Sequence, residues 1–154
     1  MVSSPSLLHK IALPYRIFFL YIEPILALGG TYLSMADPER LVLGTVPLPA
    51  FIAESPLKIT PIMQLLLTNI GALYALFAMN EAIVLRYTRE KSVWVAVVAG
   101  MLVSDFGHLY AVYAVAPERA LQMTGWNSDE WINYGTLVGG AMMRLAFLAG
   151  IGNR

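Results

Sequence analysis

The chain has 154 residues, of which 58% are hydrophobic and 13% are charged, and its mean hydropathy is +0.64. Soluble domains are usually about 45–50% apolar and about 25% charged, so we expect one small integral-membrane domain. The formal net charge is zero and no basic cluster alternates with aromatic residues, which argues against a nucleic-acid partner. The absence of cysteine excludes thiolate chemistry, and two histidines are too few for a metal site built from three.

The first apolar run, residues 17–35, predicts a membrane-spanning helix, because about 20 residues are needed to cross the hydrocarbon core. It ends in a sequence that resembles a signal-peptide cleavage site. The run is long for a signal core and contains Glu23 and Pro24, so we expect a helix that is retained. Pro24 has no N–H to give to the carbonyl of Leu20, which predicts a kink beside Glu23.

Residues 36–60 form the longest loop, with prolines at 38, 47, 49 and 56. Its apolar part is too short and too rich in proline to cross a bilayer, so we expect the loop to lie in the interface or to cap the bundle. A second span is predicted over 61–85, where a proline suits the first helical turn. On this helix Asn69 and Asn80 share one stripe, because eleven residues return nearly to the same angle, and Glu81 adjoins it.

A third span is predicted over 92–115, and its centre carries Asp105 and His108. Their i, i+3 spacing puts both side chains on one face of a helix, a turn apart. Ionisable groups at such depth are costly to bury. They therefore usually face a partner, a cavity or a substrate.

A fourth span is predicted over 131–151, with Ser128 as the expected cap of its first turn. Trp126 and Trp131 suit the aromatic belt at a membrane surface. Glycines at 135, 139 and 140 permit close packing of this helix against a neighbour. Its polar stripe, at helical spacing, consists of Asn133, Thr136, Gly140 and Arg144.

These runs predict an all-α membrane protein, a single domain over 1–154 folded as a four-helix transmembrane bundle with both termini on one side. The side that holds the termini carries Lys10, Arg16, Arg86, Arg89, Lys91 and Arg154. The opposite loops carry Arg40, Lys58 and Arg119. The positive-inside rule then predicts that both termini lie in the cytosol.

The depth of each polar residue, at about 1.5 Å per residue, predicts two layers inside the bundle. The layer nearer the cytosol holds Glu23, Asn80, Glu81 and Arg144. The layer from the midplane outward holds Asn69, Asp105, His108, Tyr110 and Asn133. Three carboxylates thus face one arginine, which stays protonated and pairs with one or two of them. Burial favours the neutral form of an unpaired carboxyl, which could protonate an alkene or epoxide while an imidazole takes the proton back.

Each of these groups also has an alternative interpretation in which its role is structural. Pairs of Arg144 with glutamate hold helices in register, Asp105 and His108 could satisfy each other by a hydrogen bond, and Glu81 could snorkel or face Arg144. The aromatic residues either pack or line a pocket that stabilises a cation. They are Tyr74, Phe77, Phe106, Tyr110 and Tyr113.

Several short motifs lie along the chain. They are Tyr15-Arg16 with Tyr21-Ile-Glu23-Pro24, Ala78-Met-Asn80-Glu81 followed by Arg86, Asp105-Phe-Gly-His108-Leu-Tyr110, Trp126-Asn127 with Trp131 and Asn133, and Arg144. This set, covering nearly the whole chain, resembles small four-pass integral membrane proteins of filamentous fungi that form a domain-of-unknown-function family. The resemblance implies residence in the endoplasmic reticulum and a role in secondary metabolism, without established catalytic residues. A looser similarity of architecture is to the emopamil-binding and sigma-2-receptor group and to fungal meroterpenoid cyclases, which use buried acids.

Two functions are compatible with these observations. The first is a cofactor-independent isomerase or cyclase that acts on a lipophilic terpenoid or polyketide intermediate, with Asp105 or Glu81 as general acid, His108 as proton acceptor and Arg144 as counter-ion. Its substrate-binding residues would be Glu23, Asn69, Tyr74, Asn80, Tyr110, Asn133 and Arg144. The second is a non-catalytic protein in the lipid bilayer: a lipid or sterol binder, a scaffold for other biosynthetic membrane enzymes, or part of a transporter. No metal site is predicted.

Overall fold

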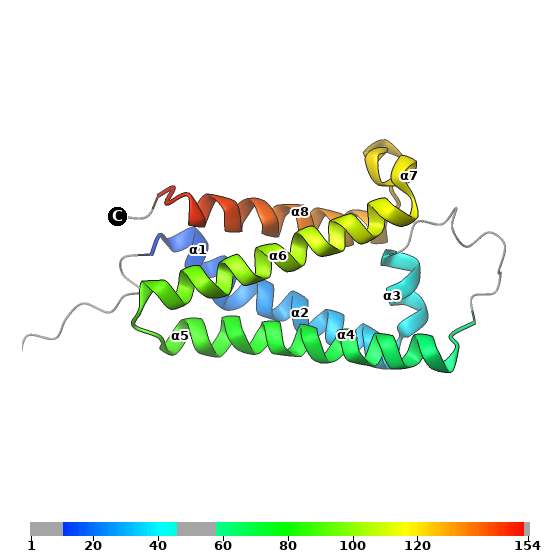
Figure 1. The fold of residues 1–154 in the computed structure, drawn as a ribbon, viewed down its shortest axis with the longest axis horizontal. Helices are drawn as coiled ribbons and strands as arrows, with labels where there is room; N and C mark the ends of the chain where they lie inside the picture. Colours follow the sequence, from blue (N-terminus) through cyan, green and yellow to red (C-terminus); the bar gives the residue numbers. More distant parts are fainter. Residues whose placement is uncertain (1–10, 46–57, 153–154) are drawn as a thin grey trace, which may run out of the picture.

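Helices account for all of the regular structure in residues 11–45 and 58–152, the two ranges that the computed structural model describes (Figure 1). The α-helices are α1 (Leu13–Ile17), α2 (Glu23–Ala36), α3 (Pro38–Thr45), α4 (Pro61–Met79), α5 (Leu85–Tyr87), α6 (Lys91–Val115), α7 (Pro117–Leu121) and α8 (Ser128–Leu148). The π-helical turns are η2 (Phe18–Ile22) and η4 (Asn80–Val84), and η5 (Met123–Gly125) is a 3-10 turn. Continuous helices α1–η2–α2 and α4–η4–α5 run beside α6 and α8, which confirms the predicted all-α class.

Three of the described helical stretches are long and apolar enough to cross a membrane, and each contains a range predicted from the sequence. They are Leu13–Ala36, Pro61–Tyr87 and Lys91–Val115, with 24, 27 and 25 residues. Only 22%, 17% and 22% of the residues in their most apolar windows are buried inside the molecule. A soluble monomer rarely exposes apolar surface on this scale, whereas lipid tails are as apolar as these side chains. These helices therefore suit a lipid bilayer and suggest a membrane protein.

The first span changes its winding just before Pro24, where the sequence predicts a kink. In η2 the helix widens by one π-helical turn, and the N–H of Glu23 bonds to the carbonyl of Phe18. The carbonyl of Leu20, which Pro24 cannot bond, accepts a hydrogen bond of 3.0 Å from Nη2 of Arg86. A side chain of the neighbouring helix thus satisfies the backbone group that proline leaves free, as a helix in hydrocarbon requires.

Small residues let α2 and α4 approach closely. Thr31 Oγ1 donates a hydrogen bond of 3.2 Å across this interface to the carbonyl of Gly71, and a Cβ on Gly71 would lie 3.0 Å from Cβ of Ser34. The sequence predicts such packing for α8, but a Cβ on Gly139 would meet nothing within 4 Å, and one on Gly135 only a side chain of its own helix. The prediction is wrong for these two glycines, because no neighbouring helix comes close to them.

The two ends of the described chain meet at one end of the bundle (Figure 1). There the hydroxyl of Tyr15 donates a hydrogen bond of 2.8 Å to the carbonyl of Ile151. Beside this contact lies an apolar core in which the rings of Phe19, Trp94 and Phe147 touch one another. Large apolar side chains therefore fill this half of the bundle.

At the opposite end α3 packs against both α2 and α8. The hydroxyl of Tyr134 donates a hydrogen bond of 2.8 Å to the carbonyl of Thr45, and Nδ2 of Asn133 donates one of 3.3 Å to the carbonyl of Gly44. These bonds fix the end of α3 to the first turns of α8. The sequence predicts a loop over 36–60, and this is wrong for Pro38–Thr45, which forms α3. Residues 46–57 of that segment fall outside the described ranges.

The last helix begins and ends about three residues earlier than predicted, at Ser128 and Leu148. Its N-cap is Asn127, whose side-chain oxygen accepts a hydrogen bond of 2.8 Å from the N–H of Glu130. In return Oε2 of Glu130 accepts one of 2.7 Å from the N–H of Asn127. The prediction of Ser128 as the cap is wrong, because this reciprocal capping box satisfies two backbone donors, whereas a capping serine satisfies one.

Replacement of Gly71 by leucine tests the close approach of α2 and α4. The added side chain would overlap Ser34, so we expect the free energy of unfolding to fall by about 1–3 kcal/mol. The measurement is thermal unfolding of the purified protein in detergent, followed by circular dichroism. Gly107→Leu is the matched control, because a Cβ on Gly107 meets nothing within 4 Å. Equal unfolding temperatures for the two variants would contradict the packing described.

Candidate functional site

A cavity of about 560 Å³ extends along the inside of the bundle and is lined by α2, α3, α4, α6 and α8. Its volume lies in the range of about 300–1,000 Å³ that is usual for sites of small molecules. Most of its wall is apolar. The polar side chains in the wall are those of Glu23, Tyr32, Arg40, Thr45, Tyr74, Ser104, Asp105, His108, Asp129, Asn133, Thr136 and Arg144.

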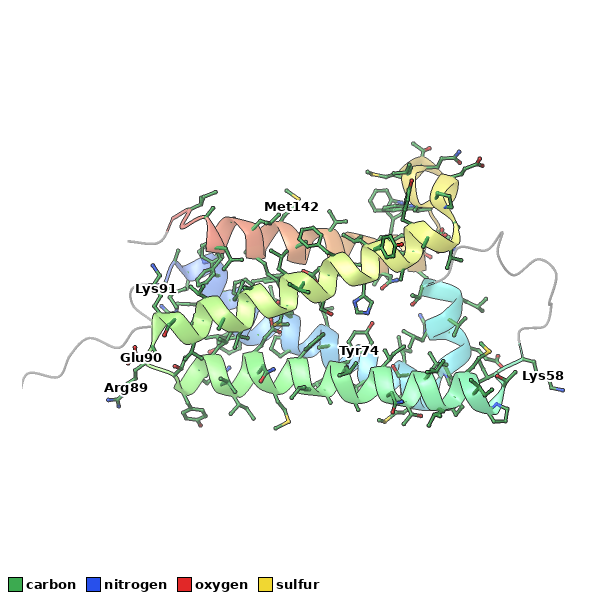
Figure 2. The ribbon with its side chains drawn as sticks, in the orientation of Figure 1. Lys58, Tyr74, Arg89, Glu90, Lys91 and Met142 are labelled. Atoms are coloured by element: carbon green, nitrogen blue, oxygen red, sulfur yellow. The ribbon has the colours of Figure 1, made fainter. Side chains whose placement is uncertain are left out.

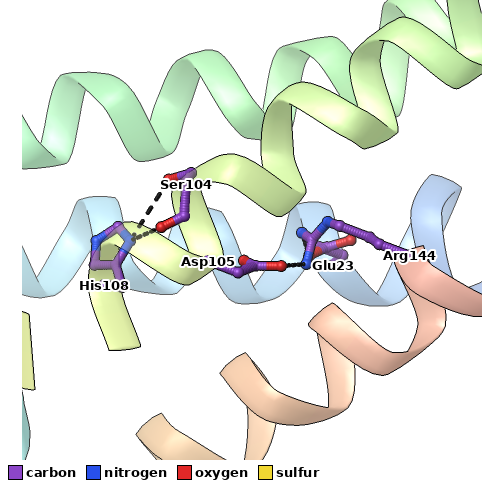
Figure 3. A network of polar contacts seen from close by, with 5 residues as sticks. All are labelled: Glu23, Ser104, Asp105, His108 and Arg144. Atoms are coloured by element: carbon purple, nitrogen blue, oxygen red, sulfur yellow. Dashed lines mark hydrogen bonds and ion pairs between the residues drawn. The ribbon is translucent and has the colours of Figure 1, made fainter. Parts of the chain in front are cut away.

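A buried ion-pair cluster (Figure 3) lies at one end of this cavity. This end is the one nearer the apolar core, and we call it the inner end. Arg144 of α8 is 3% exposed and donates from Nη1 to Oδ2 of Asp105 on α6, at 2.5 Å, and from Nη2 to Oε1 of Glu23 on α2. The guanidinium reaches both because Gly140 precedes it by one turn: a Cβ there would lie 2.8 Å from Nη1. Arg144 thus ties three helices together, and the predicted layers are corrected, since Asp105 belongs with Glu23.

Glu81 is the third acid of the cluster. It sits in η4 with 0% exposure, which excludes the snorkelling alternative, and its carboxyl interacts with those of Glu23 and Asp105 and with Arg144. No described residue donates a hydrogen bond to either of its oxygens. One arginine cannot neutralise three carboxylates in apolar surroundings, so we expect the cluster to hold a proton. Glu23 lines the cavity, whereas Glu81 does not.

His108 stands in the cavity wall about one turn beyond Asp105 (Figure 3). Its Nδ1 lies 3.0 Å from the carbonyl oxygen and 3.5 Å from the hydroxyl of Ser104. The carbonyl only accepts, so the shorter contact calls for the tautomer with its hydrogen on Nδ1, in which Nε2 is the acceptor. Its ring lies nearly parallel to that of Tyr74 on α4, at 14° and 6.3 Å between centroids. Within the described ranges His108 does not bond to Asp105, so the Asp–His pair considered from the sequence is not formed.

Only some of the remaining residues that were predicted to bind a substrate lie in the cavity wall. Asn133 and Tyr74 line the cavity, whereas Asn69, Asn80 and Tyr110 do not. Asn69 is exposed, Asn80 is half-buried, and Tyr110 is 71% exposed. The eleven-residue spacing does give one stripe on α4, but the inward face is a different one. It consists of Leu67, Gly71, Ala78 and Glu81.

Sequence reasoning missed two features of the site. Ser104 fixes the imidazole of His108, and its i, i+4 spacing was a visible signal. Arg40 of α3 and Asp129 of α8 face each other at 4.0 Å at the outer end of the cavity. Nothing in the sequence pairs these two residues, because their approach depends on how α3 folds back over the bundle end.

A comparison with protein-family models matches residues 8–154 to the family described as "Domain of unknown function (DUF7704)". Comparisons with curated proteins and with solved structures found no match. The resemblance to a domain-of-unknown-function family is confirmed, while the likeness to fungal proteins and to the emopamil-binding group stays an expectation. Because the match extends over nearly its whole length, the chain belongs to the DUF7704 family.

Proposed function

We propose that this protein is a membrane enzyme that isomerises a lipophilic small molecule by proton transfer inside the cavity. The observation that carries the proposal is a cavity of about 560 Å³ in a membrane-type bundle, with an apolar wall that holds one histidine and one charged cluster. Apolar walls with a few converging polar groups are typical of small-molecule sites. No cofactor is required, because removal and return of a proton balance within one molecule.

His108 is the residue best suited to transfer that proton. The hydrogen bond between Nδ1 and the Ser104 carbonyl fixes the ring, and no described residue forms a hydrogen bond with Nε2. Nε2 can therefore take a proton from one carbon of the substrate and return it to another. A positioned acid–base group contributes about 10²–10⁴-fold to a rate.

The geometry supports isomerisation better than cyclisation. A cyclase that protonates an alkene or epoxide needs a neutral acid in contact with the substrate. Asp105 reaches the cavity, but its Oδ2 is held by a hydrogen bond from Nη1 of Arg144. Glu81 lies outside the lining. These contacts support His108 as the group that transfers the proton better than they support either acid as the donor.

A non-catalytic lipid or sterol binder is the second candidate. It is favoured by the pairing of Arg144 with both carboxylates that reach the cavity, an arrangement that also holds helices in register. Scaffold and transport roles have no specific feature in the described residues to favour them. Residence in the endoplasmic reticulum and a role in fungal secondary metabolism rest on the resemblance alone.

The proposed topology has four membrane spans. α8 has 21 residues, about 31 Å, and is less apolar than the other three because its inner face carries polar residues. Its outer face is apolar and exposed, through Ile132, Val138, Met142 and Leu145. The bundle end that holds Arg89 and Lys91 (Figure 2) also carries Arg16 and Arg86, which supports a cytosolic position for this end.

Single cysteines test whether α6 crosses the membrane in this orientation, because the chain has no cysteine of its own. Ser92→Cys and Thr124→Cys place exposed thiols at opposite ends of the bundle. In sealed microsomes we expect a membrane-impermeant maleimide to label Ser92→Cys from the cytosolic face, and Thr124→Cys only after the membrane is permeabilised. Labelling of both thiols in sealed microsomes would contradict the proposed topology.

A blocked cavity tests ligand binding. Ala111 lines the cavity and Ala114, on the same helix, does not, and both are exposed. We expect lipophilic molecules that purify with the wild-type protein to be lost from Ala111→Trp and retained by Ala114→Trp, because tryptophan fills the space. Mass spectrometry of organic extracts from equal amounts of each protein measures this. Equal extracts from the two variants would count against the cavity as the binding site.

Isomerase activity is tested with His108→Asn, which keeps an N–H in the place of Nδ1 but has no group to accept and return a proton. In cells that lack the gene, we expect the wild-type protein to restore a product and His108→Asn to leave its isomer, of equal mass but different retention time. Tyr110→Phe, a change outside the cavity, is the control. Restoration by His108→Asn, at wild-type protein levels, would remove the catalytic role and favour the binding protein.

A further inference from the structure

The shape of the cavity limits the substrate, if the proposed function holds, and this inference rests on it. Its lining extends along η2 and α2 from Phe18 to Leu33 and along α8 from Asp129 to Arg144. Each interval is 15 residues, about 22 Å of helix at about 1.5 Å per residue. The cavity is therefore long and parallel to the helices. A molecule that fills it is elongated and lies along the bundle, as a lipid lies in a bilayer.

The distribution of polar groups along the wall determines which end of this molecule lies at which end of the cavity. The middle of the cavity is bounded by side chains such as Leu26, Phe77, Val112 and Leu137. The inner end carries the charges of the buried cluster. The opposite, outer end carries Arg40, which is exposed, and Asp129, which is half-buried. Polar atoms of a ligand at the outer end can be met by water or lipid headgroups. At the inner end only the protein can meet them, so the inner end decides which polar group is accepted.

One oxygen of Asp105 is free to accept at that inner end. Its Oδ2 is bonded to Arg144, whereas no described residue donates to Oδ1, and the side chain lines the cavity with 9% exposure. A carboxylate oxygen accepts hydrogen bonds and cannot donate them. We propose that Oδ1 of Asp105 binds the hydroxyl group of an elongated lipophilic alcohol.

A hydroxyl fits this site better than an ammonium group or a carbonyl. Oδ2 of Asp105 already pairs with Arg144, and a hydroxyl offers Oδ1 a neutral donor, so no second cation has to be stripped of water to complete the site. A carbonyl would face a carboxylate oxygen with no proton between them, and sites built to bond a hydroxyl strongly reject analogues that lack it.

The position of His108 then locates the reaction on the substrate. His108 follows Asp105 by three residues, about 4.5 Å further along the helix toward α3. The carbons that lose and regain a proton are therefore a few bonds from the anchored hydroxyl. This places the isomerised bond near one end of the molecule, and its long apolar part lies along the outer cavity.

The test compares 2-hexadecanol, 2-hexadecanone and 2-aminohexadecane, which share one skeleton. Binding to the purified full-length protein is measured by native mass spectrometry over a series of ligand concentrations. For the wild-type protein we expect the alcohol to bind about tenfold more tightly than the ketone, because its hydrogen bond goes to a charged acceptor. Ala111→Trp should remove binding of both. An amine that binds more tightly than the alcohol would overturn the choice of a neutral donor.

Asp105→Asn sharpens the test. The guanidinium of Arg144 only donates, so the amide oxygen must face Arg144 and the amide NH₂ must face the cavity. A donor replaces the acceptor, and we expect the preference to change from the alcohol to the ketone. Asp129→Asn, at the outer end of the same cavity, is the matched control and should keep the preference for the alcohol.

The outcomes separate this inference from the proposed function. If the wild-type protein binds alcohol and ketone equally and Ala111→Trp removes both, the cavity binds lipophilic molecules but Asp105 is not the anchor. If none of the three probes binds, both proposals fall. If Asp105→Asn does not fold, the wild-type comparison of alcohol with ketone still decides whether a donor is selected.

Discussion

The guanidinium of Arg144 is the group on which the arrangement of this bundle depends. It is almost fully buried, and a charge in such a place is tolerated only with counter-charges at hydrogen-bond distance. Glu23 and Asp105 supply them from two other helices. Gly140 leaves the space through which the side chain reaches both. Any change in the relative position of α2, α6 and α8 would separate these charges, so the pairing fixes the helices in one register.

Both π-helical turns of the described chain belong to this arrangement. η2 ends at the residue before Glu23, and η4 contains Glu81, so each winding change occurs where an acid enters the cluster. Such turns occur often at functional sites, because the extra residue re-aims the side chains that follow. The cluster also divides the bundle. Aromatic side chains fill the half beside the chain ends, and the other half holds the cavity.

The sequence predicts the three apolar spans well, because long apolar runs leave few alternatives to a helix in a membrane. It also predicts that Arg144 meets carboxylates, since charge count alone requires it. It does not predict that Asp105 pairs with Arg144 instead of with His108. The i, i+3 spacing shows that Asp105 and His108 share a face of the helix, but it does not show which helix packs against that face. For the same reason Asn69 was expected inside: periodicity defines a stripe on α4, while packing against α2 at Gly71 decides which stripe turns inward.

The lower hydropathy of α8 has a consequence for biogenesis. Both counter-charges of Arg144 lie on helices that the ribosome synthesises earlier, Glu23 on the first span and Asp105 on the one directly before α8. When α8 leaves the ribosome, both counter-charges of its arginine have therefore already been synthesised, and the guanidinium can pair with them as α8 packs against α2 and α6. Among the four long helices, the least apolar one is therefore synthesised after both of the helices that carry its counter-charges.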